Sequence, residues 1–133
     1  MIETIQPCRV LLADDSEVLR GLTAGMLRSI GFEVEMASDG EEALARQRAN
    51  PFPVLITDVV MPNRDGLELI REISTAYPGT KIIAMSGGGP MDVALCLKVA
   101  SRFGADAVLM KPFNREELFL ALSRAFSEKS SHV

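Results

Sequence analysis

Short apolar runs alternate with longer amphipathic segments along almost the whole chain. The runs are four to six residues long and mostly aliphatic, which is typical of strands buried within a sheet. The five predicted strands are residues 10–13, 32–37, 54–58, 81–85 and 107–110. Residues 32–37 alternate apolar and acidic side chains, so this strand is expected at an edge of the sheet.

The segments between these strands carry apolar residues at steps of three and four, the spacing of one buried helix face. The predicted buried stripes are Leu19, Leu22, Met26 and Ile30 in the first helix, Leu67, Ile70, Ile73 and Tyr77 in the third, and Leu118, Leu122 and Ala125 in the fifth. The second helix has a thin apolar face of Ala43 and Leu44, so we expect it to be the least firmly held.

Capping and turn residues mark the ends of these helices. Ser16 is a good N-cap residue, and Gly31 suits the left-handed position that follows a helix. Pro90 fits the first turn of the fourth helix. Two pairs predict capping boxes, Asp39 with Glu42 and Asn114 with Glu117.

The alternation of strands and helices predicts the fold class. Strands linked through helices pair in parallel, and their helices cover both faces of the sheet. Five units are too few for a barrel of eight, so we expect an open, doubly wound α/β sheet. With residues 32–37 at an edge, the strand order is 2-1-3-4-5, as in flavodoxin-like folds. The 133 residues are expected to form one domain, with a core over about 7–126 and a polar tail at 127–133.

Composition and charge narrow the classes of function. Hydrophobic residues make up 47% and charged residues 24%, which is usual for a globular domain. No apolar run approaches the roughly 20 residues that span a bilayer, and the first residues lack the pattern of a secretory signal. The net charge of −4 disfavours a nucleic-acid partner. Cys8 and Cys96 predict neither a disulfide nor a metal cluster, so we expect a reduced, cytoplasmic protein.

Chemically active side chains follow four of the five predicted strands. They are Asp14 and Asp15 after the first, Asp58 at the end of the third, Ser86 after the fourth and Lys111 after the fifth. Because parallel strands end at one edge, and ligands bind between strands one and three, these groups are expected in one crevice. Two like charges 4 Å apart repel by about 4 kcal/mol at an effective dielectric of 20. Three carboxylates therefore need cations, and Mg²⁺ is predicted beside Lys111.

Taken one at a time, these residues also have structural explanations. Asp14 and Asp15 could cap the first helix, and Asp58 could begin a turn. Their joint placement favours chemistry instead. An aspartate, a metal ion, a lysine and a hydroxyl supply the nucleophile, the neutralising charges and the donor that phosphoryl transfer needs.

The same segments resemble a known family. Over essentially its whole length the chain is similar to the receiver domains of two-component response regulators. The matching segments are Asp14-Asp15, residues 58–66 (DVVMPNRDG), Ser86-Gly87 and Lys111-Pro112-Phe113.

The resemblance implies an acceptor and a metal site. Asp58 would accept a phosphoryl group from the phosphohistidine of a sensor histidine kinase or a histidine phosphotransfer protein. Mg²⁺ would be bound by Asp58, directly by Asp15, through water by Asp14, and by the backbone carbonyl of Val60.

The resemblance also implies a switch. Lys111, ahead of a cis peptide bond to Pro112, would pair with the phosphoryl oxygens, and the Ser86 hydroxyl would move toward them. Val108 departs from the family, which often has an aromatic residue there that rotates with the switch hydroxyl. Val60 and Gly88 lack the polar side chains that help water attack a phosphoaspartate, so slow self-dephosphorylation is predicted.

Residues 91–103 predict a helix with more apolar surface than one buried face requires. Its polar stripe is only Asp92, Lys98 and Arg102. Either small residues face solvent there, or the helix is a docking face for a homodimer or a downstream protein.

The sequence therefore predicts a stand-alone response regulator receiver, a signalling switch that catalyses only its own phosphorylation and slow dephosphorylation. No output domain follows the last helix, so direct DNA binding is not expected, and without a long apolar run neither is a membrane partner. Two alternatives stay open. An aspartate-nucleophile phosphatase on a related fold would need a second aspartate where Val60 stands, and a phosphorylation-independent binding module would share only the fold.

Overall fold

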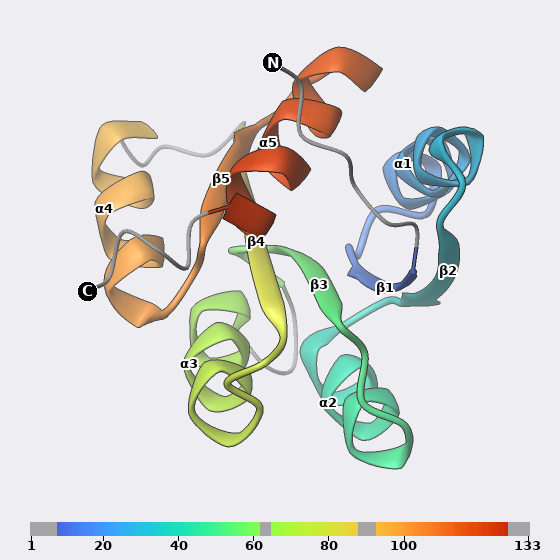
Figure 1. Ribbon diagram of the computed structural model, residues 1–133. Coiled ribbons are helices and arrows are strands. Elements are labelled where there is room, and N and C mark those ends of the chain that lie inside the picture. The colour runs from blue at the N-terminus through green and yellow to red at the C-terminus, as the bar shows by residue number, and fades with distance from the viewer. Residues whose placement is uncertain (1–7, 62–64, 88–92, 128–133) are drawn as a thin grey trace.

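The computed structural model describes residues 8–61, 65–87 and 93–127, and Figure 1 shows the whole trace. Three predictions lie outside these residues: the helix start at Pro90, the role of Gly88, and the polar tail after residue 127. Within them, no helix is long and apolar enough to cross a membrane.

Five parallel strands form one sheet in the order β2-β1-β3-β4-β5, which confirms the predicted flavodoxin-like topology. The strands are β1 (Arg9–Ala13), β2 (Glu33–Ala37), β3 (Val54–Asp58), β4 (Lys81–Ser86) and β5 (Ala107–Met110). The helices are α1 (Glu17–Ile30), α2 (Gly40–Ala49), α3 (Gly66–Ala76), α4 (Val93–Phe103) and α5 (Arg115–Ser127). The acidic, alternating β2 lies at an edge, as its pattern predicted.

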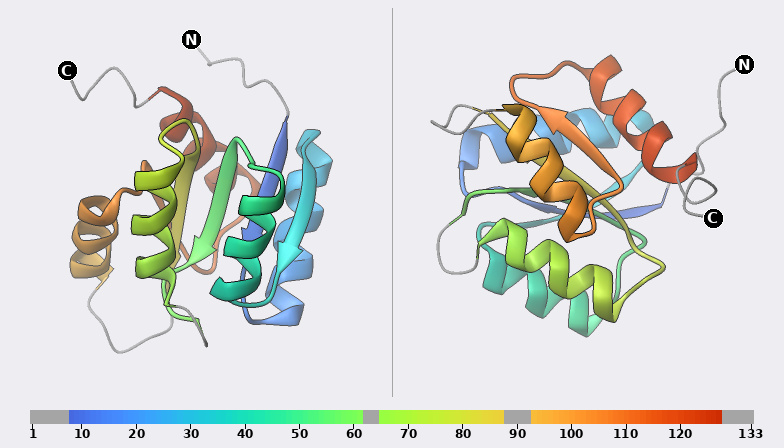
Figure 2. Two further views of the ribbon diagram at one scale, coloured as in Figure 1. Left: turned by 90° about the horizontal axis from the view of Figure 1, so that it is seen from below. Right: turned by 90° about the vertical axis from the view of Figure 1, so that its left-hand side faces the viewer.

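The helices form one layer on each face of the sheet (Figure 2). Val10 and Leu12 of β1 point into a core shared with α1 and α5. Leu11 and Ala13 point to the opposite face, into a core shared with α2, α3 and α4. The alternation of side chains along a strand explains why the central strands are apolar at every position.

Helix α1 follows its predicted buried stripe in part: Met26 and Ile30 are half-buried and pack against the core, but Leu19 and Leu22 are not buried. Its buried residues are Thr23, Ala24 and Leu27, whereas Leu19 and Leu22 are 42% and 58% exposed. The buried face of α1 is therefore centred on Thr23, Ala24 and Leu27, and Leu19 and Leu22 lie to the solvent side of it. The predicted ends are confirmed, since Ser16 Oγ accepts a hydrogen bond from the Leu19 backbone N–H at 3.2 Å and Gly31 has φ of 115°.

The other helices follow their predicted faces more closely. In α3, Ile70 and Ile73 are buried as predicted, with Leu69 in place of Leu67 and Tyr77, which are half-buried. The full predicted stripe of α5 is buried, and the helix extends to Ser127, one residue past the predicted core.

Helix α2 has a polar anchor that its thin apolar pattern did not predict. The buried Gln47 side chain donates to Thr80 Oγ1 at 3.1 Å and accepts from the Phe52 backbone N–H at 3.1 Å. These two bonds join the end of α2 to the segments before β3 and β4. The helix therefore depends on hydrogen bonds where apolar area is small.

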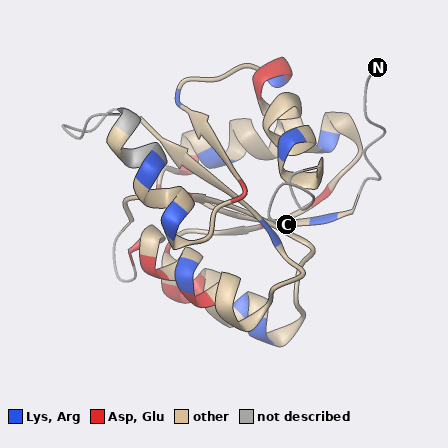
Figure 3. Ribbon diagram, turned by 60° about the vertical axis from the view of Figure 1, so that its left-hand side comes forward, with Lys and Arg blue, Asp and Glu red and all other residues tan. Residues whose placement is uncertain are grey.

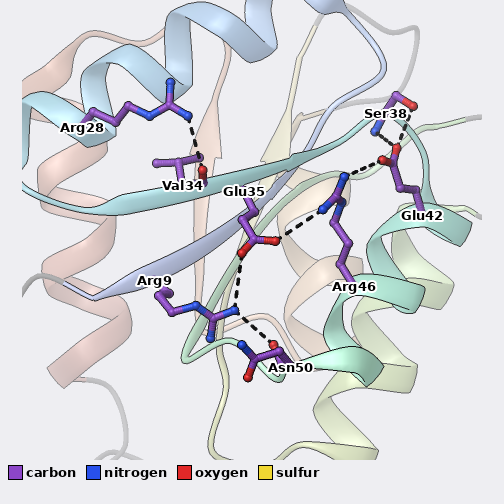
Figure 4. A network of polar contacts seen from close by, with 8 residues as sticks. All are labelled: Arg9, Arg28, Val34, Glu35, Ser38, Glu42, Arg46 and Asn50. Atoms are coloured by element: carbon purple, nitrogen blue, oxygen red, sulfur yellow. Dashed lines mark hydrogen bonds and ion pairs between the residues drawn. The ribbon is translucent and has the colours of Figure 1, made fainter.

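A network of charged side chains joins β2 to β1 and α2 (Figure 4). Glu35 contacts Arg46 at 3.4 Å and Arg9 at 3.7 Å, and Arg46 reaches Glu42 at 3.1 Å. Glu42 also accepts from the Ser38 backbone N–H at 2.8 Å. Asp39 caps α2 as predicted, its carboxylate accepting from the Glu42 backbone N–H at 2.8 Å. The box of Asn114 and Glu117 is reciprocal as predicted.

Candidate functional site

A close backbone approach fixes the end of β3. The Val59 backbone carbonyl accepts from the Gly66 N–H at 3.0 Å, so the segment that opens α3 lies against the end of the strand. A Cβ on Gly66 would overlap the Asp58 carbonyl oxygen and come within 2.6 Å of the Val59 carbonyl oxygen. Asp65 caps α3, its carboxylate accepting from the Leu67 N–H at 3.3 Å. The sequence Asp65-Gly66 therefore holds Asp58 at the carboxyl edge of the sheet.

Asp14 is fully buried at the end of β1, and its carboxylate is bonded on both oxygens. Oδ1 accepts from the Ser16 backbone N–H at 3.0 Å, and Oδ2 accepts from Lys111 Nζ at 3.0 Å. The next residue, Asp15, is exposed. The acidic pair thus divides into one carboxylate held by the protein and one that faces solvent.

Lys111 joins the ends of β1 and β3. Its Nζ lies 3.0 Å from Asp14 Oδ2 and 2.9 Å from Asp58 Oδ2. Its backbone N–H donates to the Ser86 carbonyl at 2.8 Å, and the peptide bond to Pro112 is cis, as the resemblance implied. A Cβ on Gly87 would lie 2.7 Å from the Lys111 carbonyl oxygen, so Ser86-Gly87 packs directly on the lysine backbone.

The environment changes the acidity of both partners. Burial raises the pKa of Asp58 to about 7; the Asp14 carboxylate acts in the same direction, and Lys111 acts in the opposite one. Burial lowers the pKa of Lys111, but the hydrogen bonds and charges of Asp58 and Asp14 outweigh burial and raise that pKa. A metal-free site therefore holds a cation beside a carboxylate that resists ionisation.

The acidic residues fit a small hard cation. One carboxylate oxygen each from Asp14, Asp15 and Asp58 lies within 4.8 Å of the other two. Oxygen donors in a partly open site suit Mg²⁺, which retains several waters. Since both Asp14 oxygens already have partners, Asp15 and Asp58 are better placed for direct contact. The Val60 side chain next to them is 75% exposed.

Ser86 and Val108 lie on neighbouring strands of the same edge. Ser86, at the end of β4, is buried and follows Met85, the register partner of Asp58. Val108, on β5, is half-buried and pairs with Ala84. The structure thus brings Asp14, Asp15, Asp58, Ser86 and Lys111 to the carboxyl ends of four strands, whereas Val60 lies two residues beyond β3 and Val108 lies within β5.

Two features beside the site were missed in the sequence. The first is Arg20, whose Nη1 donates to the Asp14 backbone carbonyl at 2.7 Å. The second is an apolar groove of about 420 Å³, lined mainly by Leu19, Leu22, Met26, Lys111, Pro112 and Phe113. A stripe of large apolar residues on α1 was the signal for this groove, but the same stripe was interpreted as core.

Charge elsewhere is mixed. In the view of Figure 3, acidic and basic segments are interspersed over the helices. The three acidic side chains at the site are thus a local concentration of charge, and Lys111 neutralises only part of it.

Comparison with known proteins places this geometry in a family. A family model described as the response regulator receiver domain matches residues 10–123. The response regulator receiver protein CpdR of Brucella abortus is 36% identical over 111 residues, which cover 83% of this chain and 89% of the relative. The chemotaxis response regulator CheY4 of Vibrio cholerae has a similar structure, with a TM-score of 0.79 and 34% identity over 90% of this chain and 99% of that one.

Other relatives are longer than this chain. The transcriptional regulatory protein TrcR of Mycobacterium tuberculosis is 35% identical over 127 residues, which make up 96% of this chain but 48% of the relative. The chain spans half or less of the length of TrcR and of two other transcriptional regulators, YesN of Bacillus subtilis and CpxR of Klebsiella pneumoniae.

Proposed function

Because the chain belongs to the response regulator receiver family, whose members accept a phosphoryl group and act as signalling switches, we propose that Asp58 is its phosphoacceptor. The donor is the phosphohistidine of a sensor histidine kinase or a histidine phosphotransfer protein. The observation that carries the proposal is the lysine bridge, in which one Nζ holds the buried Asp14 and the strand-end Asp58 within 3.0 Å.

The bridge suits the chemistry of transfer. An Asp58 carboxylate oxygen forms a bond to phosphorus as the bond from phosphorus to the donor imidazole nitrogen breaks. The imidazole keeps the electron pair of that bond and takes up a proton. Lys111 stands where negative charge collects on the moving oxygens, and a fixed cation at such a place stabilises the transition state.

Asp15 and Asp58 would bind Mg²⁺ directly, and Asp14 would bind it through water. The backbone carbonyl of Val60 would be a further protein ligand. When bound, Mg²⁺ supplies the charge that neutralises the carboxylates and the phosphoryl oxygens. Asp14 contributes mainly by fixing Lys111, since both of its carboxylate oxygens already have partners.

Phosphorylation would be transmitted through Ser86. Its carbonyl accepts from the Lys111 backbone N–H, so the residue that pairs with Asp58 is joined directly to the end of β4. The Ser86 hydroxyl would then turn toward the phosphoryl group. Val108 cannot act by rotating an aromatic ring, so the readout would come from the backbone after Ser86. The apolar, exposed Val60 would leave the phosphoaspartate long-lived.

The phosphodonor must reach Asp58 from the open edge, beside the apolar groove between α1 and Lys111. We propose that this receiver acts in the cytoplasm. Its output would be a downstream protein or a homodimer through residues 91–103, with neither nucleic acid nor membrane as a partner. Leu95 on that helix is 50% exposed, and most of its other apolar side chains lie outside the described residues.

Mass spectrometry after incubation with acetyl phosphate and Mg²⁺ tests the proposal. We expect a gain of one phosphoryl group that is lost in Asp58→Asn and retained in Asp65→Asn, which changes an exposed helix cap. The absence of labelling on the wild-type protein would favour a phosphorylation-independent binding module. Sustained turnover of small phosphate esters would favour the phosphatase alternative.

A further inference from the structure

The turn between β1 and α1 is held at each polar group of Asp14. Its backbone N–H donates to the Ala37 carbonyl at 3.1 Å, and its carboxylate is bonded to Ser16 and Lys111. Its backbone carbonyl accepts from Arg20 Nη1 at 2.7 Å. That carbonyl belongs to the peptide unit that leads into Asp15, and a peptide unit is planar. The bond to Arg20 therefore fixes the plane from which the Asp15 side chain extends.

Arg20 is itself firmly placed. Its backbone N–H donates to the Ser16 carbonyl at 2.8 Å in the first turn of α1, and Ser16 caps that helix. The guanidinium then reaches back to the turn that precedes the helix. Hydrogen bonds from Arg20 to Ser16, from Ser16 to Asp14 and from Arg20 to Asp14 thus connect the start of α1 to the acidic pair.

We infer that Arg20 is a positioning residue for the divalent cation, which holds the Asp14–Asp15 turn in the conformation that binds Mg²⁺. This inference rests on the proposed function, because it concerns the same metal site. Outer contacts that orient metal ligands commonly change metal affinity by 10- to 100-fold when they are removed.

The direction in which Mg²⁺ affinity changes when Arg20 is replaced distinguishes a positioning role from an effect of its charge alone. Arg20 is a cation near three carboxylates, so as a charge alone it would repel Mg²⁺, and its removal would tighten binding. As a positioning residue it orients Asp15, and its removal would weaken binding. The two roles predict opposite changes in one measurement.

The test is Mg²⁺ titration by isothermal calorimetry on the wild-type protein and on Arg20→Met, which keeps the apolar stem but removes every donor. We expect the affinity of Arg20→Met to fall about tenfold. The matched control is Arg28→Met on the same helix, whose guanidinium also donates to a backbone carbonyl, that of Val34, at 3.3 Å (Figure 4). The control should bind Mg²⁺ within twofold of the wild-type protein. Arg20→Lys, which can still donate to the Asp14 carbonyl, should recover most of the affinity.

Unchanged or tighter binding by Arg20→Met would overturn the inference, as would an equal loss in Arg28→Met or no recovery in Arg20→Lys. A metal-free amide NMR spectrum gives a second measurement. The Asp15 amide should shift in Arg20→Met and stay in place in Arg28→Met, and a fixed Asp15 amide would also overturn the inference. If the wild-type protein bound no Mg²⁺, the metal site of the proposed function would fail, while the amide shift would still report on the turn.

Discussion

Replacing Asp58 with asparagine should stabilise the metal-free protein. The native pKa of Asp58 is raised from 3.8 to about 7, so the folded state disfavours the charge that the unfolded state accepts freely. Each pH unit between these two values corresponds to about 1.4 kcal/mol, so full ionisation destabilises the fold by about 4 kcal/mol. Asparagine has nearly the same shape and can still accept from Lys111.

The distances show why Lys111 alone does not keep the pKa of Asp58 at its usual value. At an effective dielectric of 20, Lys111 at 2.9 Å attracts Asp58 by about 6 kcal/mol. Asp14, within 4.8 Å, repels it by at least about 3.5 kcal/mol. The attraction that remains has to offset the loss of water around a buried carboxylate, which is several kcal/mol. We therefore expect Asp58→Asn to raise the free energy of unfolding by about 2 to 4 kcal/mol at pH 8.

The sign of the pH dependence follows from the raised pKa. Below pH 4 the carboxyl is protonated in both states and has no effect on stability. As the pH rises from 4 to 7 the unfolded state loses its proton first, so the wild-type protein loses stability, and above pH 7 the loss is complete. The gap between Asp58→Asn and the wild-type protein should therefore widen by about 2 to 3 kcal/mol between pH 5 and pH 8.

Urea unfolding in EDTA at pH 5, 6, 7 and 8 measures this gap, provided that the slope m is the same for both proteins. Glu33→Gln is the matched control, since it removes one negative charge from an exposed residue at the start of β2. It should change the free energy of unfolding by less than about 0.5 kcal/mol at every pH. Mg²⁺ should stabilise the wild-type protein more than Asp58→Asn. A gap that did not change with pH, or an Asp58→Asn protein less stable than wild type at pH 8, would refute this reasoning.

Three further predictions follow from the site and its surroundings. Val60→Asn places a polar side chain beside the phosphoaspartate and should shorten its lifetime several-fold, measured as loss of the phosphorylated mass with time; an unchanged lifetime would contradict the role given to Val60. Gly66→Ala forces a Cβ into the Asp58 carbonyl and should lower the free energy of unfolding by more than about 2 kcal/mol, whereas Gly79→Ala, where nothing lies within 4 Å, should not. Leu22→Glu in the apolar groove should slow transfer from a phosphohistidine protein at least tenfold while leaving labelling by acetyl phosphate intact; equal slowing of both reactions would show that the groove acts on the site rather than on the partner.

The strands and the site could be predicted because both follow from the order of short segments along the chain. Central strands are apolar at every position, and parallel strands bring their ends to one edge whatever the details of packing. Asp14, Asp58 and Lys111 could therefore be grouped before any distance was known. The structure places both aspartates within hydrogen-bonding distance of Lys111.

The helix faces were harder to predict. When a helix carries more than one set of apolar residues, their spacing does not show which set is buried against the sheet. On α1 the large residues Leu19 and Leu22 look like core, yet the buried residues of the helix are Thr23, Ala24 and Leu27. The bond from Arg20 to a backbone carbonyl has no sequence signature, since any surface arginine on a first helical turn has the same pattern. The buried Gln47 is a similar case, in which a polar residue on an apolar face is recognised only through its partners.

The charged network on β2 also affects how the protein behaves at high concentration. An open sheet presents unpaired backbone groups at its edge, and another copy could extend the sheet there. On β2 an added strand would have to approach Glu33 and Glu35, two charged and exposed side chains, and Glu35 is held in place by Arg9 and Arg46. Charged side chains on an edge strand disfavour the addition of another strand, so this end of the sheet can stay open without pairing.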